Sequence, residues 1–427
     1  MRLAPHPLIY DWNRDASPEG PAKPIAMLND ETLRDGLQSP SVRSPTIDQK
    51  IDFLHHMDTL GIDTADIGLP GAGPKVAKDV ERLARAIGEG RLTIRANCAA
   101  RTLVSDIKPI AEIQQRTGVP IECCAFIGSS PIRQYAEGWT LDYLQTCTEE
   151  AVAFAVKEGM DVMYVTEDTT RADPESLRRL FTAAIRAGAK RLCVADTVGH
   201  ATPNGARAVV RFVGGLIAEL GADVGIDWHG HRDRGFGVAS SIAALEAGAT
   251  RLHGAALGIG ERCGNTPIDL LMVNLVMMGY RDNDLSGLLA YAHAVAKACD
   301  VRIAPNYPVI GADAFRTATG VHAAAVVKAF RMGDRALMDA VYAAVPASLV
   351  GRQQEIDVGP MSGRSNVIFW LESRGLPATD EIVDRILAAA KASNRTLTHE
   401  RVQSIVGGEA KIKPSGQKPE PERRHGF

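Results

Sequence analysis

The sequence has few of the features that would mark a membrane, secreted or nucleic-acid-binding protein. Its seven cysteines form no C-x-x-C pair, and most lie in apolar runs, so they predict reduced thiols rather than a disulfide framework. No run of about 18 apolar residues occurs, which argues against a transmembrane helix. Residues 1–23 contain no continuous apolar stretch of the kind found in signal peptides. The formal net charge of −3 supplies no long-range attraction to nucleic acid or to an anionic membrane. We therefore expect a cytoplasmic protein whose partners are neither nucleic acid nor membrane.

The chain does contain a regular alternation of short apolar runs and amphipathic stretches. Hydrophobic residues make up 45% and charged residues 23% of the 427 residues, which is typical of a globular protein with a substantial core. The apolar runs are bounded by Gly, Pro or charged residues, as expected of strands that are buried on both faces. The expected strands are 25–30, 64–69, 93–97, 121–127, 161–166, 191–196, 224–229 and 251–257.

The segments between these runs have the spacing of helices. Residues 47–60 repeat apolar side chains at intervals that fill one helical face, and 141–157, 174–187 and 203–220 do the same. A strand followed by a helix, repeated eight times over about 250 residues, predicts a (β/α)8 TIM barrel. A doubly wound open sheet is the alternative, but no G-x-G-x-x-G follows the first strand to favour it.

The alternation stops near Arg281, which suggests a division of the chain. We expect an N-terminal extension over residues 1–24 and a catalytic barrel over 25–283. Residues 284–410 predict a smaller α-rich accessory region. Residues 411–427 are rich in Pro, Lys, Glu and Arg and poor in apolar side chains, so they predict a disordered tail.

The strongest candidate for a functional site is the pair His229-x-His231 at the end of the seventh expected strand. Functional groups in such barrels come from the C-terminal ends of strands, and residues i and i+2 of a strand face the same side. Two imidazoles and a carboxylate suit a divalent ion that also binds substrate, and Mg²⁺, Mn²⁺ and Zn²⁺ are all candidates. Asp35 is the candidate carboxylate, because strands one, seven and eight are neighbours in a closed barrel. The alternative is a structural or surface histidine pair, which the place at a strand end disfavours.

At these residues the chain resembles the DRE-TIM metallolyases. This family includes the 2-isopropylmalate, citramalate and homocitrate synthases and the hydroxymethylglutaryl-CoA lyases. The resemblance runs in order from about residue 25 to residue 375 and is specific to the superfamily rather than to a substrate. The matching segments are 30–38 (DETLRDGLQ), 167–174 (EDTTRADP), 195–203 (ADTVGHATP), 229–231 (HGH), 258–265 (GIGERCGN), 319–322 (TGVH) and 362–364 (SGR).

The segments after the barrel resemble the acyl-CoA-condensing branch, as in Gly-Val-His322 and Val350-Gly-Arg. The implied reaction is a Claisen-type condensation of an acyl-CoA, usually acetyl-CoA, with a 2-oxo acid. Hydrolysis of the thioester then leaves CoA and a 2-hydroxy dicarboxylic acid. The leading product is 2-isopropylmalate from 2-oxoisovalerate, and the resemblance also implies a homodimer.

The resemblance implies a role for each matching side chain. The ion would be held by Asp35, His229 and His231, with Asn265 completing its shell. Arg34 would stabilise the alkoxide that forms at the ketone oxygen, and His322 would be the base, paired with Glu167 and assisted by Tyr342. Two roles have plain alternatives: His322 lies in an apolar helix where an isolated histidine is usually a core residue, and Glu167 or Asp168 would serve as a helix cap. The expected substrate contacts are Asp66, Ser129, Arg133 and Thr197.

Three departures from the family pattern leave the substrate open. Asp66 stands where the family often has Glu, and Arg232 stands where Asn commonly follows the histidine pair. Arg133 follows Ser-Pro-Ile where isopropylmalate synthases often have His, and it would pair with the second carboxylate of 2-oxoglutarate in a homocitrate synthase. The alternatives are therefore a homocitrate or citramalate synthase, a hydroxyacyl-CoA lyase and, more remotely, a non-catalytic metabolite-binding barrel.

Overall fold

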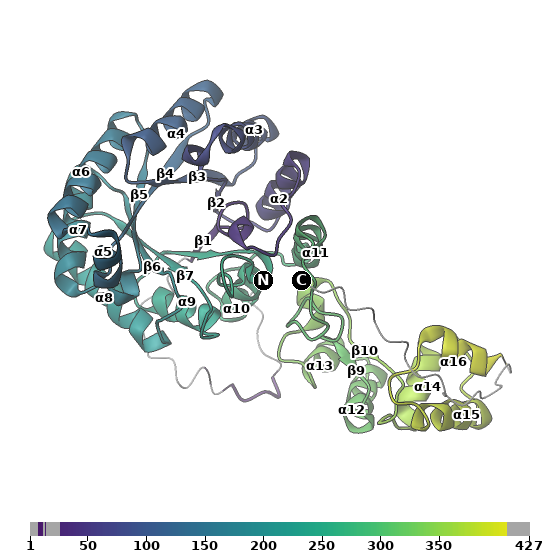
Figure 1. Ribbon diagram of the computed structural model, residues 1–427. Coiled ribbons are helices and arrows are strands. Elements are labelled where there is room, and N and C mark those ends of the chain that lie inside the picture. Colours follow the sequence, from purple (N-terminus) through teal and green to yellow (C-terminus); the bar gives the residue numbers. More distant parts are fainter. Residues whose placement is uncertain (1–6, 12, 14–25, 408–427) are drawn as a thin grey trace. The chain divides into compact units, whose positions relative to one another are not determined.

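The computed structural model describes residues 7–11, 13 and 26–407. Its first part is a closed barrel of parallel strands in the order β1 to β8, surrounded by helices (Figure 1). β1 pairs with β8 in parallel register, Met27 opposite Arg251, and this pairing closes the barrel. The expected (β/α)8 fold is confirmed. The strands are β1 (Met27–Asp30), β2 (Thr64–Asp66), β3 (Arg95–Arg101), β4 (Ile121–Gly128), β5 (Val162–Glu167), β6 (Arg191–Asp196), β7 (Gly225–Gly230) and β8 (Arg251–Gly254).

Three strands end at least three residues away from the sequence-based expectation, and the first of them is β2, which ends at Asp66 and not at residue 69. β3 continues past residue 97 to Arg101, because Cys98 to Arg101 pair with Cys123 to Phe126 of β4. β8 ends at Gly254, since residues 256–258 form a 3-10 turn in which Leu257 has a positive φ of 57°. Strand boundaries of this kind depend on the pairing partner and not on the strand's own residues.

The helices cover the barrel on the outside, and α7 shows why they form where they do. Its cap is Asp173, whose carboxylate accepts a hydrogen bond of 2.9 Å from the Ser176 amide, and Pro174 occupies the first turn. Gly188 ends the helix with a φ of 108°. The expectation that Glu167 or Asp168 caps this helix is wrong. The helices are α2 (Ile47–Thr59), α3 (Pro74–Gly90), α4 (Val104–Thr117), α5 (Pro131–Glu137), α6 (Leu141–Lys157), α7 (Pro174–Ala187), α8 (Pro203–Glu219), α9 (Gly237–Glu246) and α10 (Ile268–Met277).

The compact unit that contains the barrel extends to Ala314 and includes Ser348–Gly351, past the boundary expected at residue 283. The reason is α11 (Leu288–Cys299), which packs against α2. The buried Tyr291 of α11 donates a hydrogen bond of 2.7 Å to the Asp30 carboxylate at the end of β1. A helix that is joined to a barrel strand by a buried hydrogen bond belongs to the barrel's core.

Asp30 is fully buried, and burial raises its pKa to about 6 although Thr32 and Tyr291 donate hydrogen bonds to it. A carboxyl group with a raised folded-state pKa contributes stability at low pH, and this contribution is lost as the pH rises through about 6. We therefore expect the free energy of unfolding of the wild type to fall by about 2–3 kcal/mol between pH 4 and pH 8 through this group. The Asp30→Asn variant lacks the titrating carboxyl group and should not show this fall. Denaturant titrations at the two pH values measure this difference. The exposed Asp223→Asn is the matched control, and equal pH profiles for Asp30→Asn and the wild type would contradict the expectation.

The second compact unit comprises Phe315–Ala347 and the described part of the chain from Arg352 onward. It is rich in helix, as expected of the accessory region, and carries one short parallel sheet of β9 (Arg316–Thr317) and β10 (Glu355–Ile356). Val367, Trp370, Val383 and Ile405 belong to its main buried cluster. Its helices are α12 (Gly320–Arg331), α13 (Arg335–Ala340), α14 (Arg364–Glu372), α15 (Asp380–Lys391) and α16 (His399–Val406).

Some of the expected segments cannot be compared with the structure. The tail expected at 411–427 and most of the extension expected at 1–24 lie outside the described residues. Within the described ranges, no helix has both the length and the apolar composition needed to cross a membrane.

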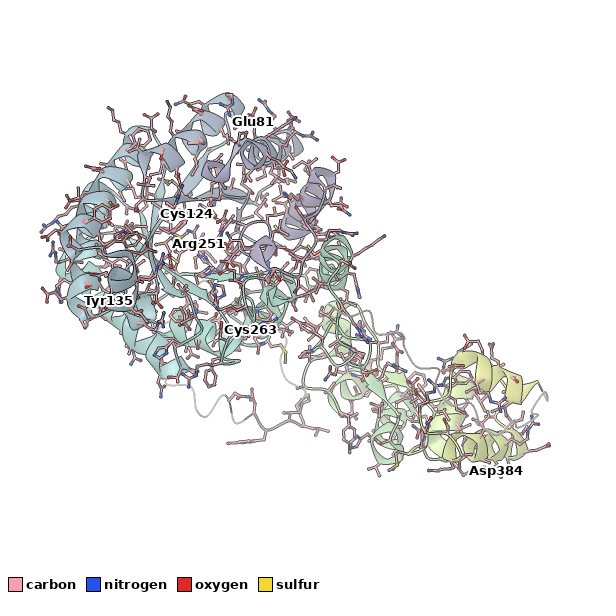
Figure 2. The ribbon with its side chains drawn as sticks, in the orientation of Figure 1. Glu81, Cys124, Tyr135, Arg251, Cys263 and Asp384 are labelled. Carbon is pink, nitrogen blue, oxygen red and sulfur yellow. The ribbon has the colours of Figure 1, made fainter. Side chains whose placement is uncertain are left out.

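The interior of the barrel holds both charged and apolar side chains. Arg251 of β8 reaches Glu122 of β4 and Asp227 of β7 through the barrel interior, so charged side chains fill part of it. Cys124, Met163 and Cys193 from β4, β5 and β6 form a buried apolar cluster. Figure 2 shows Cys124 and Arg251 inside the ring of strands. The charged and apolar groups meet at Met163, whose sulfur lies 3.2 Å from Nη2 of Arg251.

Candidate metal centre

A cavity of about 270 Å³ opens at the C-terminal ends of the barrel strands. This is where barrel enzymes carry their functional groups. Of the expected site residues, Arg34, Asp35, Asp66, Glu167, Thr197, His229 and His231 line it. The apolar residues of the lining, here called the apolar wall, are Leu69, Ala99, Cys124, Phe126, Met163, Val165, Cys193 and Ala195.

Asp35, His229 and His231 place three potential ligand atoms around one point. The Nε2 atoms of the two histidines are 3.4 Å apart, and they lie 3.6 Å and 3.8 Å from Oδ2 of Asp35. All three residues are buried. Nitrogen and oxygen ligands stand about 2.0–2.2 Å from a Zn²⁺ ion, so atoms separated in this way suit one shared ion better than direct hydrogen bonds. The donor set fits a divalent metal.

The side-chain oxygen of Asn265 has no hydrogen-bond partner among the described residues. Nδ2 of Asn265 donates hydrogen bonds of 3.0 Å to the Asp35 carboxylate and to the Ile259 carbonyl. The unpaired oxygen, Oδ1, is buried. Because an unpaired buried polar atom costs free energy, this oxygen favours a further partner at the site, and the amide nitrogen of the same side chain contacts Asp35.

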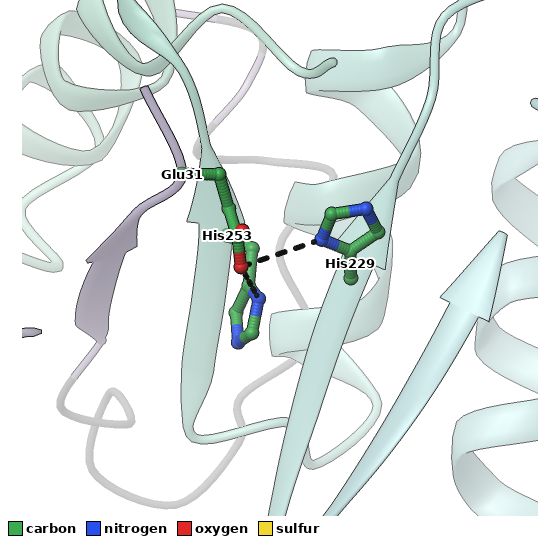
Figure 3. A group of neighbouring side chains, drawn as sticks. All are labelled: Glu31, His229 and His253. Atoms are coloured by element: carbon green, nitrogen blue, oxygen red, sulfur yellow. Dashed lines mark hydrogen bonds and ion pairs between the residues drawn. The ribbon is translucent and has the colours of Figure 1, made fainter. Parts of the chain in front are cut away.

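His229 also belongs to a second group, with Glu31 and His253 (Figure 3). Here the Glu31 carboxylate lies 2.9 Å from Nδ1 of His253 and 3.7 Å from Nδ1 of His229. Glu31 also accepts hydrogen bonds from Asn29 and from Arg34, and Nε2 of His253 faces Asp227 at 2.8 Å. These atoms already have protein partners, whereas the Asp35 group has an unpaired oxygen beside it. The Asp35 group is therefore the better place for an ion.

Arg34 is held by three carboxylates. It donates to Glu31 at 2.6 Å, to Asp66 at 2.9 Å and to Asp35 at 3.1 Å. The shorter side chain of Asp66, where the family often has Glu, thus still reaches the guanidinium directly. Burial raises the pKa of Asp66 to about 7, with Arg34 acting to lower it. The guanidinium is fixed at the edge of the cavity and keeps its charge.

The electrostatics of Asp35, His229 and His231 favour a cation at this point. Burial acts to raise the pKa of Asp35, but Arg34 and His229 outweigh it and hold that pKa well below its usual range. Burial acts to lower the pKa of His229, but Asp35 and Glu31 outweigh it and raise the value to about 9. Burial and the neighbouring His229 lower the pKa of His231 to about 4. The positive charge at this point would thus be a proton on His229 or a bound metal ion, and the metal would displace that proton on binding.

The expected substrate contacts fall into two sets. Asp66 and Thr197 line the cavity, as does Glu167, which was expected to be catalytic. Oγ1 of Thr197 accepts a hydrogen bond of 2.8 Å from the Asp168 amide. Ser129 is buried and donates to the Glu167 carbonyl. Arg133 forms ion pairs with Glu137 at 2.7 Å and with Glu167 at 3.3 Å. Ser129 and Arg133 thus stand behind Glu167, in contact with it rather than with the cavity.

His322 and Tyr342 lie in the second compact unit. Their ring centroids are 4.2 Å apart, and both side chains are exposed. His322 is therefore not the core residue that its apolar neighbours in α12 would suggest. Its role as a base stays a prediction.

Sequence reasoning assigned no role to Glu31, His253 or Arg262, although all three line the cavity. Arg262 donates hydrogen bonds to Asp233 and to the Thr197 carbonyl, which ties the loop after β8 to the loops after β6 and β7. A signal for His253 was present in the sequence. Arg251 and His253 alternate in an otherwise apolar strand, which marks an inward-facing polar row.

Comparison with known proteins places the chain in a family. The model of the HMGL-like family matches residues 26–295. The chain is 30% identical over 366 residues to the probable 2-isopropylmalate synthase of Methanopyrus kandleri, covering 85% of this chain and 68% of that protein. It is 30% identical over 379 residues to the homocitrate synthase of Pyrococcus abyssi, covering 88% and 98%.

Among solved structures, the hydroxymethylglutaryl-CoA lyase of Pseudomonas aeruginosa has a similar barrel. The TM-score is 0.54 at 18% identity, and the match covers 64% of this chain and 93% of that one. At this identity the likeness concerns the fold alone. The barrel, the matched residues 26–295 and the two relatives together show that the chain belongs to the HMGL-like family.

Proposed function

We propose that the protein condenses an acyl-CoA, acetyl-CoA first among the candidates, with a 2-oxo acid, giving a 2-hydroxy dicarboxylate and CoA. The observation that carries this proposal is the convergence of Asp35, His229 and His231 on one point beside Arg34, inside a cavity at the barrel mouth. The relatives named for 2-isopropylmalate and homocitrate support the same chemistry.

In this proposal a divalent ion, Mg²⁺, Mn²⁺ or Zn²⁺, is held by Asp35, His229 and His231, with Asn265 as a further ligand. The ion would supply Lewis-acid polarisation of the ketone of the 2-oxo acid. Two neutral imidazoles and one carboxylate leave ligand positions free for a substrate with adjacent carboxylate and ketone oxygens.

The protein's own groups supply the rest of the charge stabilisation. Arg34 is pre-positioned by its three carboxylates and stabilises negative charge that develops on the ketone oxygen. Thr197 offers its hydroxyl at the cavity wall as a contact for the substrate carboxylate. Glu167 lies at the same wall, and burial raises its pKa, which suits a group that exchanges protons.

The apolar wall favours a 2-oxo acid with an uncharged side chain, and 2-oxoisovalerate is the first candidate substrate. Arg34 and Arg262, the arginines that line the cavity, are both held by carboxylates of the protein, so neither is free for a second substrate carboxylate. Homocitrate synthesis from 2-oxoglutarate is the second candidate. The observation in its favour is Arg133, which reaches Glu167 at the cavity wall and would meet such a carboxylate if Glu167 moved aside.

A thiol-release assay with acetyl-CoA tests these assignments. The 2-oxo acids are 2-oxoisovalerate, pyruvate, 2-oxoglutarate and oxaloacetate, each with and without divalent metal. We expect metal-dependent release that is fastest with 2-oxoisovalerate. A preference for 2-oxoglutarate would establish the homocitrate alternative, and cleavage of a hydroxyacyl-CoA without condensation would establish a lyase. Tight metabolite binding with no release from any acid would overturn the enzymatic proposal.

A further inference from the structure

A row of alternating charges runs through the barrel interior to the metal centre. Arg251 of β8 joins Glu122 at 2.7 Å and Asp227 at 2.5 Å. Asp227 faces Nε2 of His253 at 2.8 Å, and Nδ1 of His253 faces Glu31 at 2.9 Å. We call these five residues, Glu122, Arg251, Asp227, His253 and Glu31, the charge row.

The charge row ends on the functional site itself. Oε1 of Glu31 lies 3.7 Å from Nδ1 of His229, and Oε2 accepts a hydrogen bond of 2.6 Å from Arg34. One carboxylate therefore contacts both a metal-ligand candidate and the arginine beside it. With Nδ1 of His229 turned towards Glu31, its Nε2 is turned towards Asp35 and His231. A carboxylate on the far nitrogen of a metal-binding imidazole orients the ring and raises its basicity.

His253 in turn limits how far Glu31 can move. Each nitrogen of its ring faces a carboxylate oxygen, and the ring meets that of His229 edge-on, with centroids 5.5 Å apart. Asp227 on the other side is held by Arg251 and Arg191. Glu31, Asp227 and His253 are almost completely buried, so water cannot replace a lost partner.

We propose that Glu31 and His253 are positioning residues that orient His229 for the metal and Arg34 for the substrate. This inference rests on the metal centre of the proposed function. Both residues line the cavity, but their polar atoms are already held by each other, by Arg34 and by Asp227, which favours a positioning role over a catalytic one.

The test compares Glu31→Gln and His253→Asn with Glu122→Gln, which alters the opposite end of the same row. Affinity for Mn²⁺ alone is measured on chelator-treated protein by the magnetic-resonance signal of the free ion. We expect Glu31→Gln and His253→Asn to bind Mn²⁺ about 10–100-fold more weakly, the usual cost of removing such a support. Glu122→Gln should bind Mn²⁺ with unchanged affinity. The kcat for the preferred 2-oxo acid should fall with Glu31→Gln even at saturating Mn²⁺, because Arg34 loses a partner.

Glu31→Asp is the second variant if Glu31→Gln does not fold. It keeps a negative charge beside Arg34 while withdrawing the carboxylate from His229, so it should lower Mn²⁺ affinity in the same direction. Wild-type affinity in folded Glu31 and His253 variants would overturn the proposal, as would equal weakening in Glu122→Gln, since the row would then serve stability alone. Because Mn²⁺ binding needs no turnover, these outcomes are independent of whether any 2-oxo acid releases thiol.

Discussion

Replacing His231 by Ala is expected to abolish metal binding and turnover together. His231 contributes one of three converging candidate ligand atoms, and burial together with His229 lowers the pKa of its ring to about 4, which favours the neutral form that binds metals. Changes behind the ligands already cost about 10–100-fold in metal affinity, so loss of a ligand should exceed about a hundredfold. Metal content of the purified protein and thiol release, measured on the same preparation, test the prediction.

The control for this experiment is His200→Ala. His200 is an exposed histidine in the loop after β6, so it matches the chemistry of the change without touching the cluster. It should retain metal and activity. If His231→Ala kept full metal content with no activity, or full activity with no metal, the assignment of the ligand set would be wrong.

Replacing Arg34 by Lys is expected to lower kcat by about 10²–10³-fold, the usual cost of removing a donor aimed at a developing oxyanion. Lysine keeps the positive charge but lacks the rigid fork that meets Glu31, Asp35 and Asp66 at once. Since the charge beside Asp35 remains, affinity for the divalent ion should change far less than kcat.

Steady-state kinetics and Mn²⁺ titration separate these two effects. Arg262→Lys is the matched control, because Arg262 also lines the cavity but is held by Asp233. Its effect on kcat should be small beside that of Arg34→Lys. A loss of metal affinity as large as the loss of kcat would show that Arg34 holds the metal site together and does not act on the substrate.

Much of the fold followed from local pattern. Short apolar runs alternating with amphipathic stretches predicted the barrel, because strands buried on both faces and helices buried on one face have different hydrophobic periods. The pattern could not place the end of the barrel unit. α11 is joined to it through Tyr291 and Asp30, two residues 261 positions apart. No local window contains both partners of such a contact.

The candidate metal ligands were accessible from sequence because two of them are two residues apart on one strand. His229 and His231 must face the same way, and the closed barrel brings Asp35 beside them. What the resemblance added at His322 and Tyr342 stays a prediction. The structure shows only that these two rings pack together in the second unit.

The sequence by itself determined the barrel and the placing of the two histidines on one side of a strand end, since each depends on residue spacing along one strand or on the repeat of strands and helices. Only the tertiary structure showed that the two groups around His229 differ in how fully their polar atoms are hydrogen-bonded. Glu31 is bonded to His253, Asn29 and Arg34, whereas the oxygen of Asn265 beside Asp35 has no partner among the described residues. The physical reason is that the hydrogen-bond partners of these side chains come from β1, β7 and β8, which meet only inside the closed barrel. No single stretch of sequence contains all of these partners.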